Sequence, residues 1–210
     1  MYNIRLAGVG GQGIITAGTI VSEAAKISGK KVIMSEIHGL SQRGGSVTVD
    51  VRMGEVYGPI IPMNTCDLIF GLEMMESFRS MEALGKVKTA LISTEKLNPI
   101  SLSMQGMEYP SFEELVEKHG KDTVIYPVDA VSIAVAAGSP KSVNTVMIGI
   151  ALGLNLIPLG ISSVTEAMKS TFSEKNIGIN TKALKLGLEW AGRMKNTQVP
   201  GSPERVYTIS

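Results

Sequence analysis

The sequence has few residues of the kinds that build metal centres and disulfides. Its 210 residues include one cysteine, Cys66, and two histidines. A single thiol cannot form an internal disulfide or supply the four ligands of an iron–sulfur cluster, and this residue set disfavours a structural zinc site. Because Cys66 precedes an apolar run, we expect a buried thiol at the start of a strand and no metal site in this chain.

Aromatic residues and blocks of like charge are also scarce. Aromatic residues make up 5% of the sequence and hydrophobic residues 44%, so we expect an aliphatic core in which 12 methionines fill gaps. The 20 basic and 19 acidic residues are interspersed, whereas nucleic-acid-binding proteins usually show a basic stripe. The sequence therefore disfavours a nucleic-acid partner.

No targeting or membrane-spanning segment is expected. The N-terminus enters a strand directly, without a basic segment followed by an apolar one. The most apolar stretch, 146–161, contains Asn155 and Pro158 and is too short to cross a bilayer. We expect a cytoplasmic protein with one domain over 1–195 and a flexible or partner-docking tail over 196–210.

Strand and helix patterns alternate along the chain. Strands are predicted at 2–7, 31–36, 47–53, 66–71, 87–93 and 123–128, and helices are predicted after the first, fourth, fifth and sixth of them. The alternation predicts a Rossmann-like three-layer α/β domain, with a mostly parallel central sheet and helices on both faces. The first two strands are expected to be parallel neighbours in a βαβ unit, and residues 56–57 to pair back as a short hairpin arm.

A glycine turn follows the first predicted strand. Gly8, Gly10 and Gly13 fall on the three glycine positions of G-x-G-x-x-G, with Gly11 and Gln12 between them. Glycines at these positions permit a tight turn, a close approach of the backbone to a phosphate, and packing of the helix on the strand. The helix that follows directs its positive end at this turn, which predicts an anion site.

The same spacing leaves a dinucleotide site open as an alternative. Glu36, about twenty residues past the glycines, is placed to hold a ribose 2′-hydroxyl, as in a free-standing NAD-binding dehydrogenase. A second glycine loop directly after Glu36 would crowd that pocket. The chain also lacks an evident catalytic acid or base for hydride transfer.

The second loop, 37–46, is polar and rich in glycine. We expect it beside the glycine turn, on the face where open α/β sheets bind ligands. Arg43 can clamp a phosphate or carboxylate next to backbone N–H groups, or it can simply pair with Glu36 to fix the loop. The loop's candidate ligand-binding residues are His38, Gln42, Arg43, Gly44 and Gly45.

These stretches resemble a known family. The sequences GVGGQG (8–13), SEIHGLSQRGGSV (35–47) and VRMGEVYGPIIP (51–62) resemble the gamma-type subunits of 2-oxoacid:ferredoxin oxidoreductases. Within that family, LNPIS (97–101), EYPSFEEL (108–115) and INTKALKLG (179–187) are most similar to the small subunits of the indolepyruvate branch. The similarity extends over nearly the whole chain to about Lys195.

The resemblance implies a division of labour. In this family a large alpha subunit holds thiamine diphosphate and 4Fe-4S clusters, and the complex oxidatively decarboxylates aryl 2-oxoacids to acyl-CoA and CO2 and reduces ferredoxin. The small subunit would be inactive alone, belong to a complex with two of each subunit, and help to form the coenzyme A side of the active site. No catalytic acid or base carries over. Pyruvate, 2-oxoglutarate or branched-chain 2-oxoacids remain alternative substrates.

Overall fold

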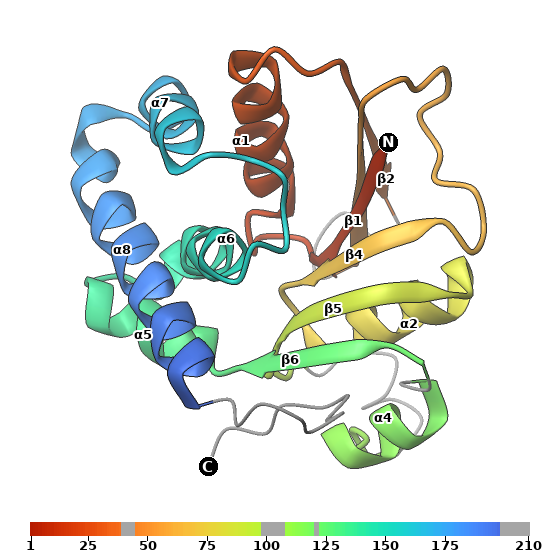
Figure 1. Cartoon of the computed structure of the whole chain (residues 1–210). Coiled ribbons are helices and arrows are strands. Elements are labelled where there is room, and N and C mark those ends of the chain that lie inside the picture. The colour runs from red at the N-terminus through yellow and green to blue at the C-terminus, as the bar shows by residue number, and fades with distance from the viewer. Residues whose placement is uncertain (39–44, 98–107, 120–121, 198–210) are drawn as a thin grey trace.

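The computed structural model describes residues 1–38, 45–97, 108–119 and 122–197 (Figure 1). Only the first two residues of the predicted tail over 196–210 fall within these ranges. The elements within them are β1 (Tyr2–Val9), α1 (Ile14–Ile27), β2 (Val32–His38), β3 (Ser46–Met53), β4 (Cys66–Gly71), α2 (Met74–Leu84), β5 (Val87–Ser93), α4 (Phe112–His119), β6 (Val124–Val128), α5 (Ala130–Ala137), a 3₁₀ turn η1 (Pro140–Ser142), α6 (Val143–Gly153), α7 (Ile161–Thr171) and α8 (Glu174–Thr197).

The strands form one mixed sheet in the order β2-β3-β1-β4-β5-β6. Strands β1, β4, β5 and β6 are parallel, as their apolar runs predict for strands buried on both faces. Figure 1 shows α1, α5, α6, α7 and α8 on one side of the sheet and α2 and α4 on the other. The predicted three-layer α/β architecture is confirmed.

The prediction that the first two strands are neighbours in the sheet is wrong. Strand β3 lies between β1 and β2 and is antiparallel to both. The connection 39–45 between β2 and β3 has seven residues, which suits a hairpin but not a parallel crossover. Because both edges of β3 are paired, no edge remains for residues 56–57, and the predicted hairpin arm is absent there.

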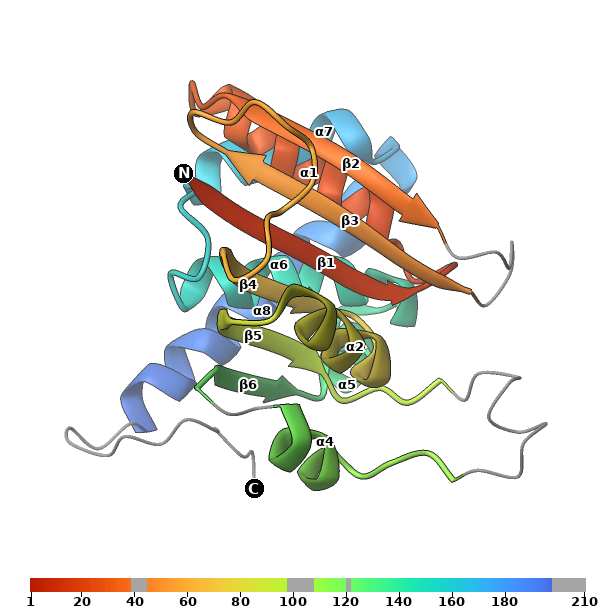
Figure 2. The same ribbon diagram turned by 90° about the vertical axis from the view of Figure 1, so that its right-hand side faces the viewer.

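The two faces of β1 differ in chemistry. Ile4 and Leu6 face the large apolar core beneath α1 and α6. Arg5 points to the other face, where it makes a two-pronged ion pair with the fully buried Asp50 of β3 (2.7 and 2.8 Å). The connection between β3 and β4 crosses this face (Figure 2), and its Ile61 N–H also donates to Asp50.

Helix α6 is a core helix, and its residues 143–152 are all buried. It packs along α8, and the two backbones meet at Gly149 and Gly187. A Cβ on Gly149 would lie 2.3 Å from the Leu184 carbonyl oxygen, so only glycine fits this crossing.

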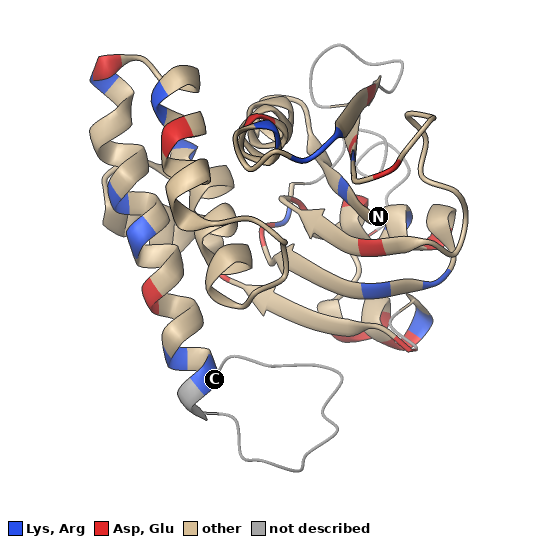
Figure 3. Cartoon of the chain, turned by 45° about the horizontal axis from the view of Figure 1, so that its top comes forward, with Lys and Arg blue, Asp and Glu red and all other residues tan. Residues whose placement is uncertain are grey.

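Figure 3 shows charged residues of both signs distributed along the helices on either side of the sheet. Among the helices within the described ranges, none is long and apolar enough to cross a membrane.

Candidate functional site at the carboxyl edge of the sheet

The parallel strands β1, β4, β5 and β6 end at one edge of the sheet. From this edge α1 leaves toward one face and α2 toward the opposite face, because their apolar residues belong to different cores. The point between β1 and β4 is thus the position where open α/β sheets form a ligand crevice. The glycine turn lies at this point.

The turn needs its glycines. Gly11 and Gly13 have φ angles of 103° and 78°, which other residues rarely adopt. A Cβ on Gly8 would lie 2.6 Å from the Gln12 side-chain oxygen. The Gly11 and Gly13 N–H groups have no acceptor within the described part of the chain, and they adjoin the positive end of α1. This arrangement suits an anion.

Helix α6 begins beside the turn, and it is this position of the helix that the sequence did not predict. Asn144, in the first turn of α6, donates from Nδ2 to the Gly13 carbonyl oxygen at 3.2 Å. Its Oδ1 accepts from the Thr145 N–H at 2.8 Å. The buried amide therefore ties the glycine turn to α6, 131 residues further along the chain.

The glycine turn lies beside Gly45, at the described end of the second loop. The Gly10 N–H donates to the Gly45 carbonyl oxygen at 3.0 Å, and Val9 pairs with Ser46 at the adjoining ladder position. Predicted site residues Gln42, Arg43 and Gly44 lie outside the described residues. His38 ends β2, where its backbone pairs with Val47.

Glu36 does not take the position that a dinucleotide requires. It lies on β2 opposite Val49 of β3, and Val49 in turn lies opposite Leu6 of β1. Two strand spacings, about 10 Å, therefore separate the Glu36 backbone from β1. In a dinucleotide site the acidic residue belongs to the strand next to β1. The geometry argues against the NAD alternative.

The Gln12 side chain spans the crevice. Its Oε1 accepts from the Val9 N–H at 2.8 Å, and its Nε2 donates to the Leu72 carbonyl oxygen at 2.9 Å and to the Glu95 carboxylate at 3.0 Å. Both amide hydrogens are thus used within the protein. The side chain joins the ends of β1, β4 and β5.

The buried carboxylate of Glu73 lies further along this edge, and the sequence did not indicate a role for it. Glu73 caps α2 by accepting from the Glu76 N–H at 2.8 Å, and it also accepts from the Tyr109 hydroxyl and the Leu97 N–H. Burial raises the pKa of Glu73, and burial together with the bond to Glu73 raises the pKa of Tyr109. The Tyr109 hydroxyl also accepts from the Met75 N–H, so the pair fixes the start of α2.

Side chains able to bind metals are dispersed in the described part of the chain. Across the described ranges, no three His, Cys, Asp or Glu side chains group closely enough to hold a metal ion. Cys66 is buried in β4, and burial raises the pKa of its thiol to about 12. A thiol that resists deprotonation is a poor metal ligand.

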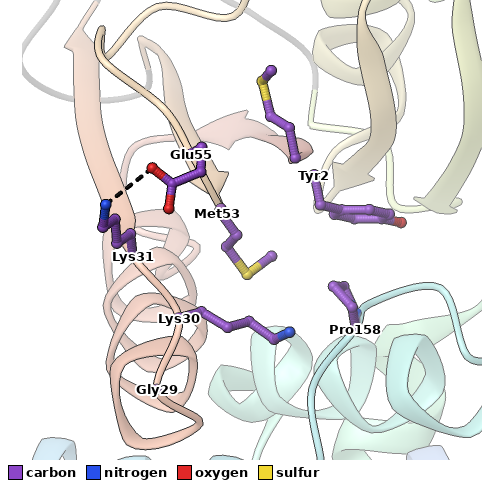
Figure 4. A pocket seen from close by; sticks show the side chains of 9 residues that line it. Tyr2, Gly29, Lys30, Lys31, Met53, Glu55 and Pro158 are labelled. Carbon is purple, nitrogen blue, oxygen red and sulfur yellow. Dashed lines mark hydrogen bonds and ion pairs between the residues drawn. The ribbon is translucent and has the colours of Figure 1, made fainter.

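A cavity of about 490 Å³ lies at the opposite, amino edge of the sheet (Figure 4). Tyr2, Met53 and Pro158 form its apolar wall, and Lys30 extends along it. At its rim Lys31 pairs with Glu55 at 2.9 Å. No described residue of either glycine loop contributes to its lining.

The chain is similar in sequence to a family of oxidoreductases. The family model described as pyruvate ferredoxin/flavodoxin oxidoreductase matches residues 3–190. The indolepyruvate oxidoreductase subunit IorB of Archaeoglobus fulgidus is 38% identical over 205 residues, which cover 97% of this chain and 98% of that protein.

Two solved structures share the fold. The gamma subunit of a keto/oxoacid ferredoxin oxidoreductase from Geobacter sulfurreducens has a TM-score of 0.66 at 23% identity, and the match covers 92% of this chain and 99% of that one. A 2-oxoglutarate:ferredoxin oxidoreductase from Magnetococcus marinus, with 2-oxoglutarate, coenzyme A and succinyl-CoA bound, has a TM-score of 0.71 at 19% identity. That match covers 100% of this chain and 33% of the other.

Proposed function

Because the chain belongs to the pyruvate ferredoxin/flavodoxin oxidoreductase family, we propose that it is the small subunit of an indolepyruvate:ferredoxin oxidoreductase. The observation that carries this assignment is the 38% identity to an indolepyruvate oxidoreductase subunit, which extends over almost the full length of both chains. The complex would convert aryl 2-oxoacids and coenzyme A to acyl-CoA and CO2 and pass the electrons to ferredoxin.

The chemistry of decarboxylation and electron transfer belongs to a large partner subunit with thiamine diphosphate and 4Fe-4S clusters. The composition of this chain supports that division, since its one cysteine is buried and its thiol is protonated at neutral pH. We propose a cytoplasmic complex with two copies of each subunit, in which this chain is inactive alone.

The small subunit contributes the glycine-loop edge to the coenzyme A side of the active site. The Gly11 and Gly13 N–H groups and the positive end of α1 suit a phosphate of coenzyme A. Arg43, between Gln42 and Gly44, would supply the cation that pairs with it. The coenzyme A in the related Magnetococcus enzyme supports this choice of ligand.

Isolation of the native complex tests the assignment of the partner. The tagged chain, purified anaerobically from its own cells, is expected to co-elute with one large protein that contains thiamine diphosphate and iron. A chain that elutes alone, or with a protein lacking thiamine diphosphate, contradicts the proposal.

Replacement of Arg43 tests the role of the second loop. In the reconstituted complex, Arg43→Ala is expected to raise the KM for coenzyme A by about tenfold, because a charge-assisted contact contributes about 1.5–3 kcal/mol. Lys182→Ala, which removes an exposed cation from α8, serves as the control. Equal KM values for the two variants remove Arg43 from the site.

A further inference from the structure

The inference starts from the hydrogen bonds of Gln12. Its two amide hydrogens are donated to Leu72 and Glu95, and its oxygen accepts from Val9, within the same half-buried crevice. No amide hydrogen is left for a ligand. Gln12 lies within the glycine turn, so its hydrogen bonds hold the turn in shape.

Glu95 is itself held in place by backbone contacts. Two residues beyond the end of β5, its carbonyl oxygen accepts from the Met74 N–H of α2 at 3.2 Å, and its N–H donates to the Ser93 hydroxyl at 3.4 Å. These contacts fix the backbone from which the carboxylate extends to Gln12. An ionised acceptor makes this the strongest type of hydrogen bond available to an amide.

We infer that Glu95 is a positioning residue, which acts through Gln12 to hold the Gly11 and Gly13 N–H groups in the orientation that binds the phosphate of coenzyme A. The inference rests on the proposed function for its ligand. Without the carboxylate, one of the three hydrogen bonds of the Gln12 side chain is lost. The turn is then held less firmly, and its Gly11 and Gly13 N–H groups can rotate away from the phosphate.

The charge of Glu95 and its hydrogen bond to Gln12 have opposite expected effects on coenzyme A binding, which makes the inference testable. A carboxylate beside an anion site repels the anion, so removal of the Glu95 charge should strengthen binding if the charge were all that mattered. Removal of the hydrogen bond should weaken binding. Glu95→Ala removes both, whereas Glu95→Gln removes the charge and keeps an acceptor oxygen for Gln12.

The experiment measures coenzyme A KM and kcat in the reconstituted complex with its large subunit. Glu95→Ala is expected to raise the KM about tenfold and change kcat less than about twofold. Glu95→Gln is expected to have a KM at or below that of the wild type. Glu82→Ala, which removes an exposed carboxylate from α2, is the control and should match the wild type.

A second variant keeps the test decisive. Gln12→Met has a similar shape without hydrogen bonds, and the double variant Gln12→Met/Glu95→Ala should have a KM for coenzyme A no higher than that of Gln12→Met alone. An unchanged or lower KM in Glu95→Ala overturns the inference. If that variant does not assemble, an unchanged KM in Gln12→Met overturns it. A wild-type complex without 2-oxoacid turnover refutes the proposed function instead, so the two failures are distinguishable.

Discussion

The Gly10 N–H donates a hydrogen bond to the Gly45 carbonyl oxygen, 35 residues further along the chain (3.0 Å). The bond continues the antiparallel ladder of β1 and β3 by one position, because Val9 pairs with Ser46. The inserted strand β3 therefore brings the second glycine loop to the turn that follows β1. An arrangement with β2 beside β1 would instead leave room there for a dinucleotide.

The crossing of α6 and α8 should be intolerant of any added side chain. Gly149→Ala places a Cβ against the Leu184 carbonyl oxygen and is expected to destabilise the chain by about 1–3 kcal/mol. Gly192→Ala, on α8 with open space around it, is expected to stabilise by about 0.4–1 kcal/mol. Urea unfolding of both variants measures the difference, and effects of the same sign would contradict this packing.

The buried ion pair between β1 and β3 should matter far more than a surface pair. Asp50→Ala leaves the Arg5 guanidinium without its carboxylate and is expected to lower the free energy of unfolding by about 3–5 kcal/mol. Glu23→Ala, which breaks the exposed pair with Lys26, should lower it by less than about 1 kcal/mol. Chemical denaturation compares them. Equal losses would show that the Arg5–Asp50 pair is not desolvated.

Glu73 should make stability depend on pH in the direction opposite to most carboxylates. Because burial raises its folded pKa above the usual 4.5, the folded state binds the proton more tightly than the unfolded state. Its stabilising contribution is complete below about pH 4.5 and is lost as pH rises through the folded pKa. The unfolding free energy of Glu73→Gln relative to wild type should therefore rise as pH increases toward neutrality.

The exposed Glu114 provides the control of opposite sign. Its pKa is lowered by hydrogen bonds from the Ser111 N–H and hydroxyl, so its contribution is lost as pH falls through the folded pKa. Thermal unfolding across the acid range measures Glu73→Gln and Glu114→Gln against wild type. A flat difference for Glu73→Gln would contradict the raised pKa.

Local patterns in the sequence were sufficient to predict most elements. The predicted strand over Cys66–Gly71 is confirmed, because an apolar run depends only on neighbours in the sequence. The position of β3 was not predicted, since period-two alternation identifies a strand without naming its neighbours.

The candidate site was predictable only in part, because some of its contacts join residues far apart in the sequence. The glycine turn follows from local spacing, but two of the three partners of its Gln12 side chain are 60 and 83 residues away. The burial of Glu73 depends likewise on Tyr109, 36 residues further on. Such contacts come from the order of strands in the sheet, and no local pattern encodes them.

The most direct test of the account is turnover by the separate and combined subunits. Indolepyruvate-dependent reduction of a viologen dye is measured anaerobically for this chain alone, for the large subunit alone, and for the two together, with and without coenzyme A. The account predicts no turnover by this chain alone and coenzyme A-dependent turnover by the pair. Robust turnover by the isolated chain would contradict it.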